Sequence, residues 1–170
     1  SKHYYFLVTG TLYESKYSGS DKIERDGGFS GKYVINALAG IEIPIGRKNK
    51  NAEDVSSKPE KKVFALNLKF TQAGGKRFTP VNIVATQAEG NVQYYDDLAF
   101  SEQYKDYSRV DVKVSFKMNQ KKITQSIFIT VENVLSTKNV FTEVYDSGKQ
   151  QMRTEYQLGL FPYGGYRIEF

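Results

Sequence analysis

Apolar and polar residues alternate one by one along several stretches of this sequence. The pattern is clearest in segments 63–72 and 110–118, where every second residue is apolar: Phe64, Leu66, Leu68, Phe70, Val110, Val112, Val114, Phe116 and Met118. A helix has about 3.6 residues per turn and would mix the two sets on every face. A strand points successive side chains to opposite faces, so the pattern predicts strands with one apolar and one polar face.

The same alternation predicts six long strands, at 4–13, 33–45, 63–72, 108–118, 123–134 and 155–170. Such strands are expected to pair in chain order as an antiparallel meander, which makes the chain all-β. Pro162 and the pair Gly164 and Gly165 fall inside the last predicted strand. Proline and glycine in a strand interior favour a bend or bulge there.

The connections between the predicted strands alternate in length. Those at 14–32, 74–107 and 135–154 are long and polar, 46–62 is intermediate and 119–122 is very short. Long loops on one side and short turns on the other are typical of a bacterial outer-membrane barrel, and tilted strands of about ten residues can cross a bilayer. A soluble sandwich or lipocalin-like barrel would show the same alternation with its apolar face turned inward, so both interpretations stay open.

Aromatic residues favour the membrane interpretation. The chain contains 13 Tyr and 11 Phe, and membrane barrels carry girdles of aromatic side chains at both interfaces. Seven tyrosines lie near the ends of predicted strands: Tyr4, Tyr5, Tyr13, Tyr33, Tyr107, Tyr156 and Tyr166.

Composition argues against several other functions. Without cysteine the chain has no disulfide, no thiolate metal site and no cysteine nucleophile, and the single histidine, His3, provides no zinc site or histidine-based triad. The net charge is +5, but the 24 Lys and Arg residues are scattered rather than gathered in a basic stripe, so no nucleic-acid partner is expected. We also expect no enzymatic activity, no metal and no cofactor.

Four segments resemble TonB-dependent outer-membrane receptors in the order found in that family. Residues 154–170, TEYQLGLFPYGGYRIEF, resemble the last barrel strand with its terminal aromatic residue. Residues 73–80, AGGKRFTP, resemble the start of a long surface loop, and 101–111, SEQYKDYSRVD, the re-entry into the next strand. Residues 132–135, ENVL, resemble the junction before the final hairpin.

This resemblance implies a barrel of roughly 22 strands with an internal plug. The chain would then be a single segment, the C-terminal portion of that barrel without the plug domain, in a bacterial outer-membrane receptor that imports a scarce nutrient such as a siderophore, glycan or peptide. The implied partners are outer-membrane lipid, the remainder of the barrel and plug, TonB through the missing part, the barrel-assembly machinery and a surface lipoprotein. Tyr166, Ile168 and Phe170 would form the signal that the assembly machinery recognises. The alternative is a soluble β-barrel or sandwich that binds a small ligand.

The long middle connection carries the candidate contact residues for a ligand or a partner: Phe78, Tyr94, Tyr95, Phe100 and Tyr104. Aromatic side chains in a loop can stack on a ligand, or they can fold the loop onto itself. The segment GGKR at 74–77 lacks the spacing of a phosphate-binding loop. Asp96, Asp97 and Glu102 lack the ligand spacing of an EF-hand calcium site.

Overall fold

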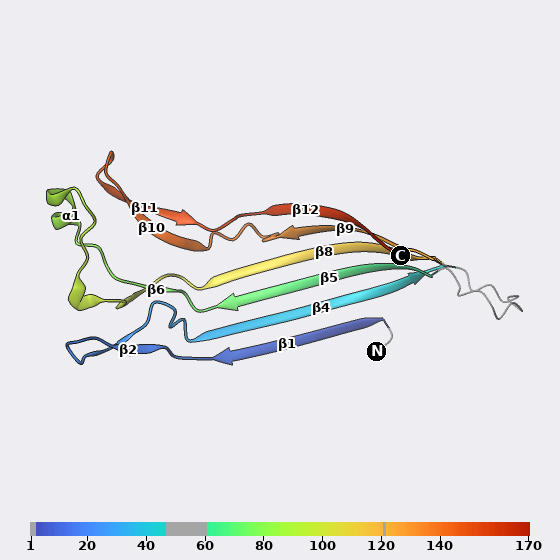
Figure 1. Cartoon of the computed structure of the whole chain (residues 1–170), viewed down its shortest axis with the longest axis horizontal. Coiled ribbons are helices and arrows are strands. Elements are labelled where there is room, and N and C mark those ends of the chain that lie inside the picture. Colours follow the sequence, from blue (N-terminus) through green and yellow to red (C-terminus); the bar gives the residue numbers. More distant parts are fainter. Residues whose placement is uncertain (1–2, 47–60, 121) are drawn as a thin grey trace, which may run out of the picture.

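The computed structural model describes residues 3–46, 61–120 and 122–170. Six long strands form one antiparallel sheet in chain order (Figure 1): β1 (Tyr4–Leu12), β4 (Tyr33–Ile45), β5 (Lys61–Ala73), β8 (Tyr107–Asn119), β9 (Thr124–Glu132) and β12 (Phe161–Glu169). The predicted all-β class, with an antiparallel meander of about six long strands, is confirmed.

The remaining elements interrupt the three long connections, which all lie at one end of the sheet, the left end in Figure 1. We call this the loop end, residues 13–32, 74–106 and 133–160. It contains two hairpins, a short two-stranded ladder and two helices: β2 (Lys16–Ser18) with β3 (Glu24–Asp26), β10 (Val140–Asp146) with β11 (Gln151–Tyr156), β6 (Arg77–Phe78) with β7 (Glu102–Gln103), α1 (Ile83–Glu89) and the 3-10 helix η1 (Asp96–Leu98). Among the described residues, no helix has the length and apolar character needed to span a membrane.

The sixth predicted strand, 155–170, is corrected by the structure. Its first residues belong to β11, which pairs with β10, and β12 begins only at Phe161. Pro162 and the two glycines pair with β9 residue by residue, with no shift of register, so the predicted bulge is wrong. β12 lies at the edge of the sheet and is hydrogen-bonded to a neighbouring strand on one side only. Proline, which has no N–H to donate, can be accommodated in such an edge strand.

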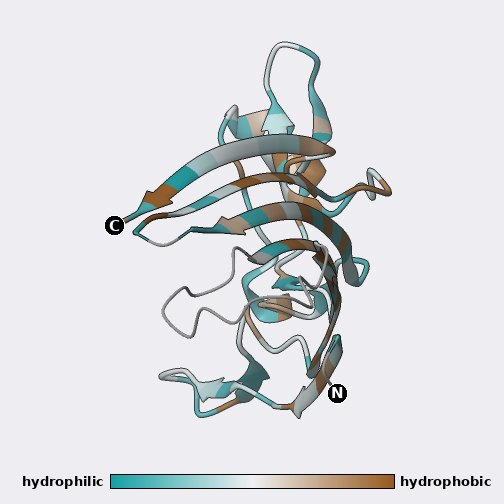
Figure 2. Ribbon diagram, turned by 90° about the vertical axis from the view of Figure 1, so that its right-hand side faces the viewer, coloured by the Kyte–Doolittle hydropathy of each residue, from teal (hydrophilic) through white to brown (hydrophobic). Residues whose placement is uncertain are grey.

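The register places the alternating residues on two faces of the sheet. Leu66 lies between Ile41 of β4 and Val114 of β8, and Ile129 of β9 lies opposite Val114. One residue further along, Asn67 lies between Gly40 and Lys113. The result is one continuous apolar face and one mostly polar face, which also carries some apolar side chains, among them Leu7, Leu38, Val63, Phe128 and Phe161; Figure 2 shows brown and teal alternating along the strands.

Nothing in the described residues covers the apolar face. None of their hydrophobic side chains is buried, and Leu66 and Ile129, from the middle of the sheet, are 41% and 61% exposed. The six strands form a single layer, in which β1 and β12 are the two edges and do not pair with each other. A soluble sandwich would need a second layer against this face, and no such layer occurs in the described part of the chain.

On the polar face, aromatic rings lie over glycines of the neighbouring strand. A Cβ added to Gly165 of β12 would lie 2.8 Å from the ring of Phe128 of β9, the residue with which it pairs. Lys113 of β8 places its Nζ 4.7 Å from the centre of that ring. Tyr5 covers Gly40 in the same way and donates a hydrogen bond to Asn67. Such pairs fill the space that a glycine leaves in a sheet.

A buried polar network joins the sheet to the loop end. The Asn133 N–H donates to Asp111 Oδ1 (3.0 Å), and the guanidinium of Arg109 donates twice to Asp111 Oδ2 (3.1 and 2.8 Å). The side chain of Asn139 exchanges two 2.9 Å hydrogen bonds with the backbone of Ser108, as a neighbouring strand would. Asn133 and Asn139 are 1% and 5% exposed, so the hydrogen bonds that these two residues make are largely shielded from water.

We predict that Asp111→Ala will lower the free energy of unfolding by about 1.5–3 kcal/mol, because it removes a charged acceptor and leaves the Asn133 N–H without a partner. The matched control is Glu155→Ala. Glu155 accepts a 2.7 Å bond from Arg153, also two residues away, but that pair is largely exposed and should contribute less than about 1 kcal/mol. Guanidinium unfolding of the purified protein measures both changes. Equal losses would contradict the role of the network.

Candidate ligand-binding site at the loop end

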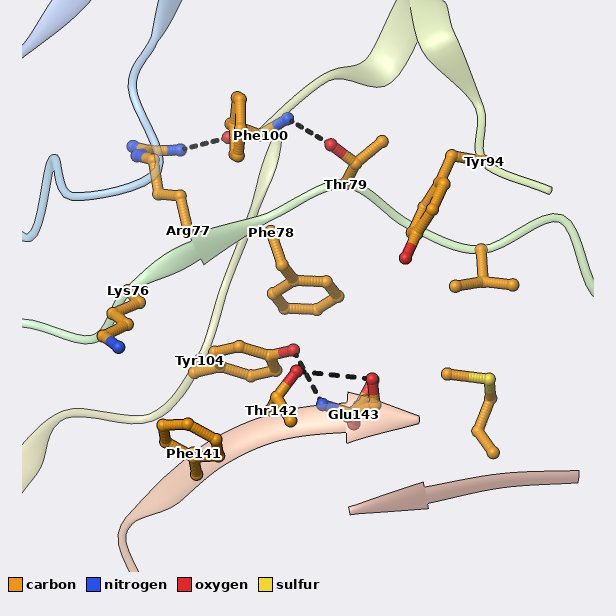
Figure 3. Close-up of a pocket in the computed structure, with 12 residues that line it drawn as sticks. Lys76, Arg77, Phe78, Thr79, Tyr94, Phe100, Tyr104, Phe141, Thr142 and Glu143 are labelled. Atoms are coloured by element: carbon orange, nitrogen blue, oxygen red, sulfur yellow. Dashed lines mark hydrogen bonds between the residues drawn. The ribbon is translucent and has the colours of Figure 1, made fainter. Parts of the chain in front are cut away.

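A pocket of about 390 Å³ opens at the loop end between the β6–β7 ladder and the β10–β11 hairpin (Figure 3). Four of the five predicted contact residues, Phe78, Tyr94, Phe100 and Tyr104, line it. Tyr95, the fifth, is not in its lining. The structure therefore brings together most of the aromatic residues that the sequence singled out, and their contact with a ligand stays a prediction.

Two stacked rings form one wall of the pocket. Phe78 and Tyr104 lie 4.2 Å apart between ring centres and 13° from parallel. The Tyr104 hydroxyl accepts a 3.2 Å hydrogen bond from the backbone N–H of Glu143 in β10. Burial raises the pKa of Tyr104 above its usual value of 10.0, so its hydroxyl stays neutral at physiological pH. This wall offers a flat apolar surface with a polar edge.

Arg77 connects the pocket to the β2–β3 hairpin. The Arg77 guanidinium pairs with Asp26 at 2.8 Å and donates to the backbone oxygen of Phe100 at 3.3 Å. The backbone N–H of Arg77 donates to the backbone oxygen of Gly28 at 3.0 Å. In Figure 3 the guanidinium points toward Phe100 and away from the stacked rings. The N–H of Phe100 in turn donates to Thr79 Oγ1 at 3.1 Å. Arg77 therefore holds the loops in place, and its charge is already balanced.

Lys76 is placed differently. Its Nζ lies 5.7 Å from the ring centre of Phe29 and 5.6 Å from that of Phe141, so two rings from separate connections flank one ammonium group. Lys76 also lines a second pocket of about 290 Å³, which extends to Ala73 and Tyr107 where β5 ends and β8 begins. The two pockets thus meet at this lysine.

The chemistry of the site suits binding. Among the described residues, no group of three or more His, Cys, Asp or Glu side chains is arranged to hold a metal ion. Asp96 and Asp97 lie in η1 and Glu102 in β7, outside the lining of either pocket described above. Aromatic walls with a few polar groups are typical of small-molecule sites.

Sequence reasoning missed the contribution of the β10–β11 hairpin, which supplies Phe141, Glu143 and Met152 to the pocket. We expected 135–154 to be a polar loop. Segment 140–145, VFTEVY, is rich in the β-branched and aromatic residues that strands favour, and the Asp-Ser-Gly turn that follows at 146–148 is a hairpin signal that could have identified these strands.

The three residues expected to act in assembly lie at the far end of the sheet from this site. Tyr166 and Ile168 lie in β12 on the apolar face, where they are 59% and 43% exposed, and Phe170 follows the strand and is fully exposed. They are accessible in the described structure, and their recognition by other proteins stays a prediction.

Comparisons of the chain with protein-family models, with curated proteins and with solved structures gave no match.

The conformation of the loop end depends on two glycines where connections cross. A Cβ on Gly31 would lie 2.7 Å from the carbonyl oxygen of Gly74, and one on Gly74 would overlap the carbonyl oxygen of Gly31. We predict that Gly74→Ala will separate the two backbones and expose the loop end to limited proteolysis, at a cost of about 1–3 kcal/mol. Gly10→Ala is the control, because a Cβ on Gly10 meets nothing within 4 Å. Identical digestion of both variants would show that the crossing is not required.

Proposed function

We propose that this chain is part of the wall of an outer-membrane β-barrel, the C-terminal barrel portion of a TonB-dependent receptor that imports a scarce nutrient. The observation that supports this most is the continuous apolar face, which spans six strands and is uncovered in the described residues. Soluble monomers rarely expose an apolar surface of this extent. Lipid would cover this face, and further strands of the barrel would pair with β1 and β12.

Strand length is consistent with this proposal. β4, β5 and β8 each contain 13 residues, which at about 3.3 Å per residue gives a length of about 43 Å. Tilted by about 45°, such strands cover about 30 Å, the thickness of the hydrocarbon core. Strands in soluble sheets most often have about five or six residues.

The polar face and the loop end have separate roles in the proposal. Asn67, Lys69, Asp111 and Lys113 would face the water-filled interior, where the plug domain would lie. The loop end would face outward, with its aromatic pocket on the path of an incoming nutrient. TonB would act through the plug, and a surface lipoprotein could dock at the loop end.

The test places a spin label on each face. The chain contains no cysteine, so Leu66→Cys and Asn67→Cys each add one thiol to it, on adjacent residues that point to opposite faces. With the full-length protein in lipid vesicles, a nitroxide at 66 should collide more with oxygen, which concentrates in lipid. A nitroxide at 67 should collide more with a water-soluble nickel chelate. Val114→Cys and Lys113→Cys repeat the comparison on β8.

The orientation of residues 66 and 67 toward lipid and water also predicts how substitutions there change stability. Leu66→Arg should lower stability by about 2–4 kcal/mol if the residue lies near the bilayer midplane, whereas Asn67→Arg should cost much less. Refolding titrations in lipid measure the difference. The proposal fails if labels at 66 and 67 meet oxygen and nickel equally.

A further prediction concerns assembly. By resemblance, Phe170 belongs to a signal for the barrel-assembly machinery, so Phe170→Ala should reduce the amount of assembled protein in the outer membrane. Tyr95→Ala is the control, since it removes another exposed ring that lies outside the sheet. Heat-modifiable migration in gel electrophoresis measures the folded fraction. Unchanged levels of folded Phe170→Ala protein would reject the assembly role.

A further inference from the structure

Two pockets at the loop end differ in character and share one cation. The larger pocket has the stacked rings of Phe78 and Tyr104 as a wall, together with Met152 of the hairpin. The smaller pocket is lined by Lys105 as well as Lys76, and it reaches Tyr107, which lies on the polar face of the sheet with Asp111. Lys76 therefore lines both the larger pocket, which has an aromatic wall, and the smaller pocket, which has a second lysine.

The charges of this region are unevenly balanced. Arg77 is paired with Asp26, but no carboxylate of the described residues lies within 4.0 Å of the ammonium group of Lys76 or Lys105. The smaller pocket has no acidic residue in its lining, and the nearby carboxylate of Asp106 already accepts hydrogen bonds from the Gly75 N–H and the Tyr33 hydroxyl. The larger pocket has one, Glu143, on the β10 side.

We propose that the two pockets together bind a small organic anion with a single carboxylate or sulfonate at one end and a flat apolar body. The anionic group contacts Lys76 and Lys105, and the body lies against the rings of Phe78 and Tyr104. Glu143 repels a negative charge in the larger pocket, which fixes the orientation and disfavours ligands with charges at both ends. The inference rests on the proposed function only in identifying the ligand as one that enters the barrel from the loop end.

The experiment uses two probes that share one body. 1-Naphthoate carries a carboxylate on a flat apolar ring system, and 1-naphthylmethylamine carries an ammonium group on the same rings. Isothermal titration of the full-length protein in detergent should show that naphthoate binds at least roughly tenfold more tightly than the amine, as expected for a charge-assisted contact.

Variants identify the residues responsible. Lys76→Gln should weaken naphthoate binding by roughly tenfold but should not weaken binding of the amine, because the anion loses a partner whereas the cation loses only a repelling charge. Phe78→Ala should weaken both probes. Lys149→Gln is the control: it makes the same charge change in the turn between β10 and β11, outside the lining of both pockets. Circular dichroism shows whether Lys76→Gln folds. If it does not, Lys105→Gln provides a second test of the lysines in the smaller pocket.

The outcomes separate this inference from the proposed function. Equal affinity for the two probes, no binding of naphthoate, or an unchanged affinity in both lysine variants would overturn the inference. If the spin labels on β5 still show lipid and water on opposite faces, the barrel proposal survives that result. If naphthoate binds as expected but the labels show no such difference, the anion site stands and the barrel proposal falls.

Discussion

An apolar surface that none of the described residues covers is the constraint on which this structure depends. Each long strand sends every second side chain to the same side, and the register aligns these side chains from β1 to β12. Removing such a surface from water provides about 25 cal/mol per Å², so a face of this size does not remain uncovered in a stable state. In the barrel proposed above, lipid rather than a second protein layer would cover this face. The long strands, the open edges and the gathering of the long connections at one end are consistent with that covering.

Polar contacts then determine how the loops attach to the sheet. Asp111 is the first buried position of β8 below the loop end, and it orients both the turn at Asn133 and the guanidinium of Arg109. The side chain of Asn139 forms with the Ser108 backbone the two hydrogen bonds that a neighbouring strand would form. These bonds fix the position of the first residue of the β10–β11 hairpin, which follows Asn139 directly. Because this hairpin forms one side of the aromatic pocket, the hydrogen bonds at its base help to position that side.

The alternating pattern predicted the sheet well because period 2 directly reports which face a side chain occupies. It failed at 157–160, where Leu158 and Leu160 continue the alternation outside any strand. There the Asn133 side chain donates to the Leu158 oxygen, and the Gln157 N–H donates to the Asn139 oxygen, so these partners come from residues distant in the sequence. The site shows the same limit. Its aromatic residues from one connection were predictable as a group, whereas Lys76 and Phe141 meet only through tertiary packing.

The rings that lie over glycines on the polar face couple positions in different strands. Phe128 occupies the volume that a side chain at position 165 would need, so enlarging Gly165 is tolerated only if the ring at 128 shrinks or leaves. The same reciprocity holds between Tyr5 and Gly40. Among descendants of a common ancestor, each pair should therefore change together or not at all, and its joint variation would record the pairing of β9 with β12 and of β1 with β4 in sequence alone.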